Sequence, residues 1–430
     1  MDAYLLSIGD ELLIGQTVNT NAAWLGERLS LMGLEVVEGR TLTDRSDRIR
    51  AALHDACAAA DLVVITGGLG PTHDDLTKVA VADFLGVEMH RDDVLWERIQ
   101  TYYTERDRPV PERAAQIADM PAGFEKLANP IGTAPGLRFQ GEASNGALLI
   151  VLPGVPAEMK AIFDASVQPL LADRTDLRST AHRTLQTTGI GESDLQAEIG
   201  DADALLPERV SLAYLPSTSG VRLRLTARAD DPDTATQILD TAEARIRKRA
   251  DAHIFATGNV SLAEALGRRL TDAQLTVSTA ESATGGLVGD RLTNVPGSSA
   301  YYAGGIIAYA NRIKINQLQV DAEVISSHGA VSEPVARQMA QGVRTALGTD
   351  IGVATTGIAG PGGGSDAKPV GTVWVGYADA HGTHAAHVRF VNDRYMNKAL
   401  FATAALDMVR RQLNRRDGQD AASPRYDSVA

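Results

Sequence analysis

The residues with the clearest chemical potential lie in segment 279–286, which reads Thr-Ala-Glu-Ser-Ala-Thr-Gly-Gly. A β-branched, apolar run precedes it and a run with helical spacing follows it, so we expect a strand, a tight turn and a helix start. Ser282 and Thr284 would lie at the first helical turn, where unpaired backbone N–H groups bind anions. Gly285 and Gly286 would let a ligand approach the backbone. The alternative is a helix cap with a packing turn, which such a turn alone forms more often.

Later segments carry polar residues that could converge on this serine. Tyr309, Asn311 and Lys314 follow a strand expected at 303–307. A serine can be activated by a neutral lysine, provided that burial or a neighbouring cation lowers the lysine pKa. Backbone amides of the serine turn could form an oxyanion hole or hold a phosphate. The alternative is that Lys314 is a surface lysine on an amphipathic helix, the commoner position for a lysine.

Two further segments are glycine-rich or cationic. Thr356, Gly357 and Gly360 follow a strand expected at 351–355, and Arg394 precedes the last expected helix. Together with the serine and the lysine, they fit nucleophilic attack on an amide of an anionic substrate. The chain has no G-x-S-x-G elbow. Three histidines resemble a ligand cluster, but their turn-and-strand segment should expose them to solvent: His381, His384 and His387.

A second group of candidates lies nearer the N-terminus, where glycines stand beside two carboxylates: Gly67, Gly68, Gly70, Thr72, Asp74 and Asp75. The glycines would expose backbone N–H groups to phosphate oxygens. Asp10 and Glu11 follow another strand and could join Asp74 and Asp75 in binding a divalent cation that bridges those phosphates. The alternative is that Asp74 and Asp75 only cap the next helix. The convergence of Asp10 favours a phosphate and metal site.

Alternating elements must position these residues. The hydrophobic pattern of the first part predicts strands at 3–8, 35–37, 62–66 and 147–152 and helices at 22–32, 47–60, 75–84, 91–115 and 157–171. Strands that alternate with helices predict a parallel α/β sheet covered on both faces. Ligands of such sheets bind at the carboxyl ends of the strands, where Asp10 and the glycine loop both fall.

The remaining chain divides further. Segment 183–255, with a strand pair and one long helix at 232–250, predicts a small α+β unit, and a third part again alternates strand and helix. The polar tail has no apolar period, so we expect it to be disordered. The predicted domains are 1–172, 173–257 and 258–413, followed by the tail at 414–430.

Composition limits the class of protein. A chain of 430 residues suggests two or three domains, and 44% hydrophobic residues allow sizeable cores. The formal net charge of -13 disfavours a nucleic-acid partner. The single cysteine, Cys57, is expected to be a buried helical thiol and can form no internal disulfide. Without a membrane-spanning run or a signal peptide, a cytoplasmic location is expected.

Together the sequence segments described above resemble those of the CinA family of competence/damage-inducible proteins, which are also nicotinamide-nucleotide amidohydrolases. The resemblance implies a molybdopterin-binding-like first domain that acts as an ADP-ribose pyrophosphatase with a divalent metal (Mg, Mn or Co). It implies a KH-type middle domain and a cofactor-independent last domain that deamidates nicotinamide mononucleotide, in a homodimer. The match covers nearly the whole chain, through segments 7–13, 66–77, 129–136, 152–159, 280–286, 309–314, 331–334, 356–361 and 368–373.

By position, the resemblance assigns Ser282 as the nucleophile, with Lys314 and Tyr309 assisting. Two departures from the family pattern are visible: Ala283 stands where many members have cysteine, and Arg312 changes the charge near Lys314. The metal ligands expected are Asp10, Asp74 and Asp75. The residues expected to bind substrate are Thr284, Gly285, Gly286, Asn311, Thr356, Gly357, Gly360 and Arg394, and in the first domain Gly67, Gly68, Gly70 and Thr72.

The middle domain lacks the GXXG spacing with which KH domains clamp nucleotides, so its expected fold does not predict RNA binding.

Two other functions remain open. The chain could be a deamidase with a degenerate first domain, or a non-catalytic protein that acts through partners in competence or DNA repair. The intact Ser282, Tyr309 and Lys314 favour catalysis over the non-catalytic alternative.

Overall fold

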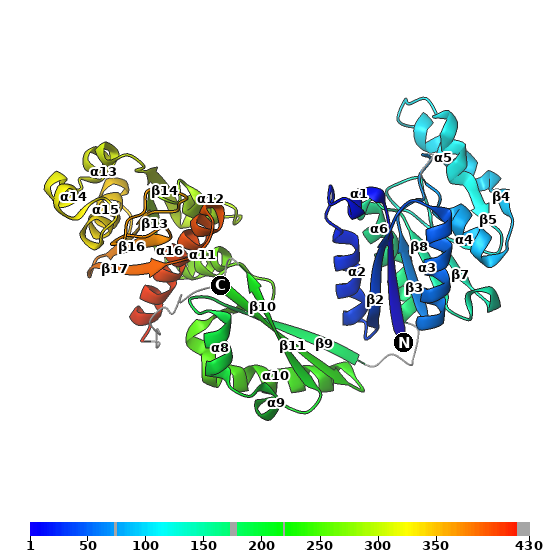
Figure 1. The fold of residues 1–430 in the computed structure, drawn as a ribbon, viewed down its shortest axis with the longest axis horizontal. Helices are drawn as coiled ribbons and strands as arrows, with labels where there is room; N and C mark the ends of the chain where they lie inside the picture. The colour runs from blue at the N-terminus through cyan, green and yellow to red at the C-terminus, as the bar shows by residue number, and fades with distance from the viewer. Residues whose placement is uncertain (73–74, 173–178, 218–219, 419–430) are drawn as a thin grey trace. The chain divides into compact units, whose positions relative to one another are not determined.

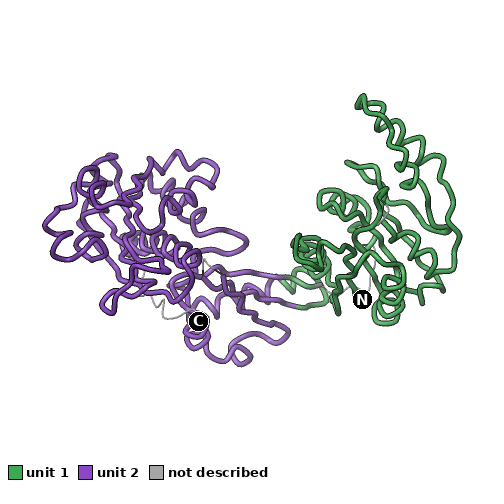
Figure 2. The backbone as a smooth tube through the Cα atoms, turned by 45° about the horizontal axis from the view of Figure 1, so that its top comes forward, with its two compact units in different colours: residues 1–181, 228–235 green, residues 182–227, 236–430 purple. Residues whose placement is uncertain are grey.

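The structure is a computed structural model that describes residues 1–72, 75–172, 179–217 and 220–418 (Figure 1). These residues belong to two compact units, one made of 1–181 with 228–235 and the other of 182–227 with 236–430 (Figure 2). Among the described residues, no helix combines the length and apolar character that a membrane span requires.

The first unit is built on a six-stranded sheet with the order β2-β1-β3-β8-β7-β6. Its first four strands are parallel, as expected: β1 (Asp2–Ile8), β2 (Glu35–Leu42), β3 (Leu62–Thr66) and β8 (Leu148–Leu152). The last two strands, β7 (Gly136–Gln140) and β6 (Glu125–Leu127), pair antiparallel: β7 with β8, and β6 with β7. The sheet is therefore mixed rather than wholly parallel. A short antiparallel pair, β4 (Met89–Arg91) and β5 (Asp119–Pro121), stands apart.

Helices cover both faces of this sheet (Figure 1). On β3, Val63 and Ile65 join one apolar cluster while Leu62 and Val64 join the other, because successive side chains of a strand point to opposite faces. The first cluster includes residues of α3 (Ser46–Ala59), α4 (Thr77–Leu85) and α5 (Asp93–Thr104). The second includes residues of α2 (Thr20–Leu31), α6 (Pro156–Ile162) and α7 (Gln168–Ala172), and a further short helix is α1 (Asp10–Leu13).

The single helix predicted at 91–115 is wrong. The structure has α5 and then a 3-10 helix at Glu112–Ala118. Asp92 caps α5 by accepting a hydrogen bond from the N–H of Leu95 at 2.8 Å. Pro109 and Pro111 follow the helix and lack the N–H that a continuous helix needs, so the chain must change its path there.

The chain continues with a four-stranded sheet of order β10-β11-β9-β12, most of which belongs to the second unit. Its strands are β9 (Ser179–Thr187), β10 (Val210–Ser217), β11 (Gly220–Ala229) and β12 (Ile254–Thr257). Three helices accompany it: α8 (Glu192–Ile199), α9 (Ala202–Leu205) and the predicted long helix α10 (Pro232–Ala250).

The rest of the second unit is a five-stranded sheet of order β14-β13-β15-β16-β17. Three strands are parallel, β13 (Val277–Glu281), β14 (Tyr302–Ile307) and β15 (Ile351–Gly357), and two are antiparallel, β16 (Thr372–Asp379) and β17 (Gly382–Arg389). One face packs on α11 (Leu262–Asp272), α12 (Leu287–Thr293) and α16 (Arg394–Arg416). The other packs on α13 (Asn311–Leu318), α14 (Ala322–His328) and α15 (Glu333–Leu347).

Helix α16 extends three residues into the segment expected to lack structure. Arg269 of α11 donates hydrogen bonds to Asn414 and, at 2.7 Å, to Asp417, and these contacts hold the end of α16. The remainder of the predicted tail, 419–430, lies outside the described residues.

Candidate functional site

Ser282 lies at the carboxyl end of β13, between the ends of β14 and β15. Its backbone N–H donates to the carbonyl of Thr355 at 2.9 Å, which ties the serine turn to the neighbouring strand. The residue is 9% exposed, so it is shielded from bulk water but still reachable. The predicted strand, turn and helix start are confirmed here, and the parallel strands place Ser282 at the edge of the sheet where ligands bind.

Lys314 is the immediate neighbour of Ser282. It lies on α13, is 1% exposed, and places its Nζ 3.0 Å from Ser282 Oγ. Nζ also donates to the carbonyls of Ala308 at 2.8 Å and Tyr309 at 3.2 Å. Burial lowers the pKa of Lys314 to about 8. In its charged form the amine donates to all three oxygens, and in its neutral form two hydrogens serve the carbonyls and leave the lone pair for the serine proton.

Tyr309 and Arg394 form the outer edge of the site. Tyr309 is 64% exposed, and its hydroxyl accepts a hydrogen bond from Arg394 Nη2 at 3.3 Å. Arg394 Nη1 donates to the carbonyl of Gly360. The contacts of the tyrosine hydroxyl are therefore with the arginine and not with Ser282 or Lys314. The exposed guanidinium offers a positive charge at the mouth of the site.

Three groups expected to bind substrate are engaged inside the protein instead. The hydroxyl of Thr284 is fully buried and lies 2.7 Å from the Thr355 hydroxyl. The hydroxyl of Thr356 donates to the carbonyl of Ala330 at 2.7 Å. The N–H of Gly286 donates to a carboxylate oxygen of Glu281, so it cannot serve the predicted oxyanion hole.

The other predicted contacts differ in accessibility. Gly285 adopts a left-handed conformation with φ of 64°, and Asn311 is the exposed first residue of α13. Gly357 is needed for packing, because a Cβ there would lie 2.7 Å from the carbonyl oxygen of Thr372. The three histidines at 381, 384 and 387 are exposed on or beside β17, which confirms the expectation that they face solvent.

Sequence reasoning missed Lys398. Its Nζ lies 3.7 Å from the position that a Cβ on Gly285 would take, so a second cation stands beside the serine turn. A signal was available: Lys398 follows Arg394 by four residues on α16, and residues four apart share one face of a helix.

The glycine loop of the first unit lines a cavity of about 400 Å³ at the carboxyl ends of β1 and β3. Gly67 has φ of 102°, and a Cβ there would lie 2.2 Å from the carbonyl oxygen of Ile8. At Gly68, with φ of 66°, a Cβ would lie 2.1 Å from Thr77 Oγ1. Both positions favour glycine because of their positive φ, and at Gly67 the backbone of Ile8 also leaves no room for a side chain.

The predicted metal site is not assembled by the described residues. Asp75 Oδ2 accepts hydrogen bonds from the N–H of Thr72 at 2.7 Å and from its hydroxyl, so this carboxylate closes the loop. Asp10 is exposed and does not line the cavity, and Asp74 lies outside the described residues. Within the described ranges, no three histidine, cysteine or acidic side chains gather at metal-binding distance. Carboxylates that do line the cavity, and that the sequence did not single out, are Asp44 and Glu158.

Comparisons with known proteins agree along the whole chain. Residues 4–173 match the description "Probable molybdopterin binding domain", 182–256 "Damage-inducible protein CinA KH domain" and 259–413 "CinA C-terminal domain". A CinA-like protein of Salinibacter ruber is 55% identical over 414 residues, covering 96% of this chain and 100% of the relative. The chain belongs to the CinA family.

A second curated CinA relative supports the same assignment. The CinA-like protein of Chloroherpeton thalassium is 41% identical over 423 residues, covering 96% of this chain and all of the relative. A crystal structure of the protein CinA from Thermoplasma acidophilum is 35% identical, with a TM-score of 0.36, and covers 39% of this chain and 97% of that one. The three domains of the family thus follow one another here in the predicted order.

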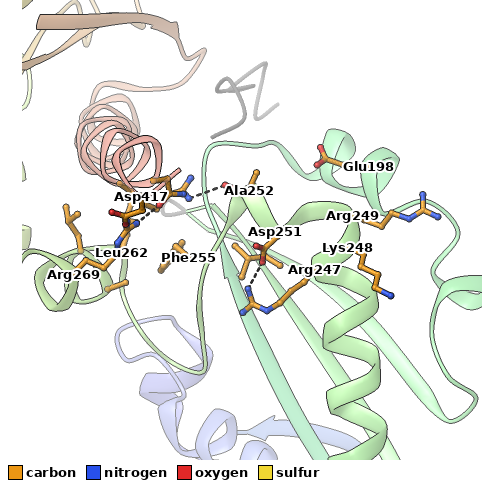
Figure 3. A pocket seen from close by; sticks show the side chains of 15 residues that line it. Glu198, Arg247, Lys248, Arg249, Asp251, Ala252, Phe255, Leu262, Arg269 and Asp417 are labelled. Atoms are coloured by element: carbon orange, nitrogen blue, oxygen red, sulfur yellow. Dashed lines mark hydrogen bonds and ion pairs between the residues drawn. The ribbon is translucent and has the colours of Figure 1, made fainter. Parts of the chain in front are cut away.

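This CinA family member also has a wide pocket of about 790 Å³ in its second unit, away from Ser282 (Figure 3). Two of the cations that line it are paired within the protein: Arg247 with Asp251 at 2.7 Å and Arg269 with Asp417 at 2.7 Å. Lys248 points away from these pairs in the view of Figure 3. The residues that line this pocket include no serine, threonine or cysteine nucleophile, so we assign no reaction to it.

Proposed function

We propose that the last domain hydrolyses the carboxamide of nicotinamide mononucleotide to nicotinic acid mononucleotide and ammonia. The observation that carries the proposal is the buried amine of Lys314, 3.0 Å from Ser282 Oγ, with its pKa lowered to about 8 by burial. An amide is a poor electrophile, so the serine needs a base of this kind to attack it. The matched domains of the family are consistent with an enzyme. The contact between the lysine amine and the serine hydroxyl supports transfer of the acyl group to the serine.

The reaction begins when Ser282 Oγ bonds to the carboxamide carbon and its proton passes to the neutral amine of Lys314. The carbonyl electron pair moves to oxygen, and backbone N–H groups of the serine turn stabilise that oxyanion. The tetrahedral intermediate then expels the amide nitrogen, which takes the proton from Lys314 and leaves as ammonia. Water, activated by the same amine, hydrolyses the resulting ester and releases the carboxylate.

The anionic part of the substrate would lie toward the cations of α16. Arg394 is exposed at the mouth of the site, and Lys398 stands beside Gly285. A guanidinium suits a phosphate because its N–H groups form two parallel hydrogen bonds with the phosphate oxygens. We assign the 5′-phosphate of the nucleotide to these two residues.

The test is release of ammonia from nicotinamide mononucleotide by the purified protein. Ser282→Ala and Lys314→Ala should each lower kcat by about a hundredfold or more, and the double variant should be little worse, because the pair acts as a unit. Ser326→Ala, which removes an exposed hydroxyl on α14, is the matched control and should leave kcat unchanged. Near-normal turnover by folded Ser282→Ala would replace the serine mechanism with direct attack by water.

A second candidate activity belongs to the first domain. The cavity lined by the glycine loop favours a nucleotide diphosphate, since backbone N–H groups suit phosphate oxygens. We therefore also propose that this domain hydrolyses ADP-ribose to AMP and ribose 5-phosphate. The described residues alone do not form a cation site, so we assign no reaction step to a metal. The requirement of this activity for a divalent metal is a prediction, which chelation tests.

A further inference from the structure

The residue before the proposed nucleophile is a buried carboxylate with three backbone partners. Glu281 ends β13 and is 2% exposed. Its Oε2 accepts from the N–H groups of Gly286 at 2.9 Å and Val288 at 3.0 Å. Its Oε1 accepts from the N–H of Gly289 at 2.8 Å. A buried carboxylate needs such partners, and hydrogen bonds to an ionised acceptor are the strong ones.

This arrangement changes where an oxyanion can bind. The N-terminus of α12, which would otherwise attract an anion, is already occupied by the protein's own carboxylate. On the turn itself, the N–H groups of Ala283, Thr284 and Gly285 have no acceptor among the residues that the structure describes. Successive unpaired N–H groups on a turn form an anion-binding concavity. Thr284 is fully buried, so the amides of Ala283 and Gly285, and not the helix terminus, are the available donors.

Both ends of the turn are anchored. At its start, the N–H of Ser282 donates to the carbonyl of Thr355. The hydroxyl of Thr355 is also in contact with the buried hydroxyl of Thr284. At its end, Gly286 has φ of 103° and is held by Glu281. A turn tied at both ends has few conformations open to it, which is the pre-organisation that oxyanion stabilisation requires.

We propose that Glu281 is the positioning residue of the oxyanion hole. It holds the far end of the turn so that the N–H groups of Ala283 and Gly285 receive the carboxamide oxygen as Ser282 attacks. This inference rests on the proposed deamidase function. The positioning role differs from a capping role in its consequence. Loss of a cap lowers the stability of the fold, whereas loss of the oxyanion hole lowers the rate of the chemical step in a protein that is still folded.

The experiment compares Glu281→Ala and Glu281→Gln with the wild-type chain. Asp321→Ala is the matched control, because Asp321 also caps a helix, α14, by accepting the N–H of Glu323 at 2.8 Å. With folding checked by circular dichroism at the assay temperature, Glu281→Ala should lower kcat for nicotinamide mononucleotide by about a hundredfold, with KM changed less than about threefold. The kcat of Glu281→Gln should lie between those of the wild-type chain and Glu281→Ala, because the amide group of glutamine keeps only one accepting oxygen.

A second readout does not depend on the substrate. A sulfonyl fluoride forms a bond between its sulfur and an activated serine oxygen as fluoride leaves, and its sulfonyl oxygens use the same N–H donors. The rate of Ser282 labelling, followed by intact mass, should fall about tenfold or more in Glu281→Ala and remain unchanged in Asp321→Ala.

The outcomes separate the two proposals. Unchanged kcat and labelling in either folded Glu281 variant would overturn the positioning role. If the wild-type chain is labelled at Ser282 in a Glu281-dependent way but releases no ammonia, the deamidase proposal fails and the positioning role stands. If the wild-type chain is not labelled and releases no ammonia, both fail.

Discussion

At the scale of single residues, the chemistry depends on the charge of Lys314. Its amine is surrounded by two carbonyl oxygens and the serine hydroxyl and is nearly inaccessible to water. Desolvation disfavours the ammonium form, and this lowers the pKa to about 8. The base is therefore available near neutral pH without a histidine partner.

The pH dependence of deamidation should report this amine. Because only the neutral form accepts the serine proton, kcat/KM for nicotinamide mononucleotide should rise with pH and level off above about 8. Below that pKa, kcat/KM should fall about tenfold for each pH unit. Initial rates of ammonia release between about pH 6.5 and 9.5 measure it. A flat profile in a chain that remains folded throughout would show that Lys314 is not the base.

Arg394 should act on binding rather than on chemistry. Its guanidinium is exposed and bound only to Gly360 and Tyr309 among the described residues, so its charge is available to a phosphate. Arg394→Ala should raise KM for the mononucleotide about tenfold and change kcat less than about threefold.

Nicotinamide riboside supplies the control for Arg394, because it lacks the phosphate. Its KM should be the same in Arg394→Ala and in the wild-type chain. Arg312→Ala removes an exposed arginine from the neighbouring helix α13 and should leave both substrates unaffected. An equal loss of kcat with both substrates would instead place Arg394 in the chemical step.

At the scale of elements, α15 lies unusually close to the sheet that carries the serine. A Cβ on Gly376 of β16 would lie 2.1 Å from the carbonyl oxygen of Ala336, and one on Gly352 of β15 would lie 2.1 Å from that of Ala340. The helix can approach so closely only because both strand positions lack a side chain. The core on that face accordingly uses small residues, such as Ala354 and Ala378.

Gly376→Ala should therefore destabilise the second unit. The added methyl group meets backbone rather than a flexible side chain, so α15 must move, at a cost of about 1–3 kcal/mol. For a unit of this size the Tm should fall by roughly 2–4 °C per kcal/mol.

Gly362→Ala is the control for this substitution. Apart from its chain neighbours, a methyl group added to Gly362 would have no described atom within 4 Å, so the Tm should stay within about 1 °C of the wild-type value. Thermal unfolding followed by circular dichroism measures both. Equal stability of Gly376→Ala and the wild-type chain would mean that the helix can shift at no cost.

At the scale of the whole molecule, the two candidate sites belong to different compact units. The glycine-loop cavity lies in residues 1–181 with 228–235, and the serine site in 182–227 with 236–430. No described residue lines both. The two proposed activities should therefore be separable by reagents and by single substitutions.

Chelation should separate them. EDTA should abolish AMP release from ADP-ribose, with recovery on adding Mg, Mn or Co, and should leave ammonia release within about twofold, because the serine site uses a hydroxyl, an amine and backbone N–H groups. Asp75→Ala should reproduce the loss of AMP release alone, because Asp75 is the predicted metal ligand that lines the glycine-loop cavity, and Ser282→Ala should reproduce the loss of ammonia release alone. Loss of ammonia release on chelation would contradict the serine–lysine mechanism.

The sequence by itself determined the family, the order of the domains and many of the elements. The strand predicted at 62–66 is β3, and the helix predicted at 232–250 is α10. Both follow from periodicity within one short segment, which burial imposes locally. The serine, lysine and arginine were also identified from their types and from their positions after strands.

Only the tertiary structure decided which of these groups are available. Lys314 was as compatible with a surface position as with a site, and it is the fold that buries it against Ser282, 32 residues away. The hydroxyls of Thr284 and Thr356 and the N–H of Gly286 were plausible ligands until their partners inside the protein were seen. The partners of the two threonine hydroxyls lie 71 and 26 residues away in the chain, and a local pattern does not contain that information.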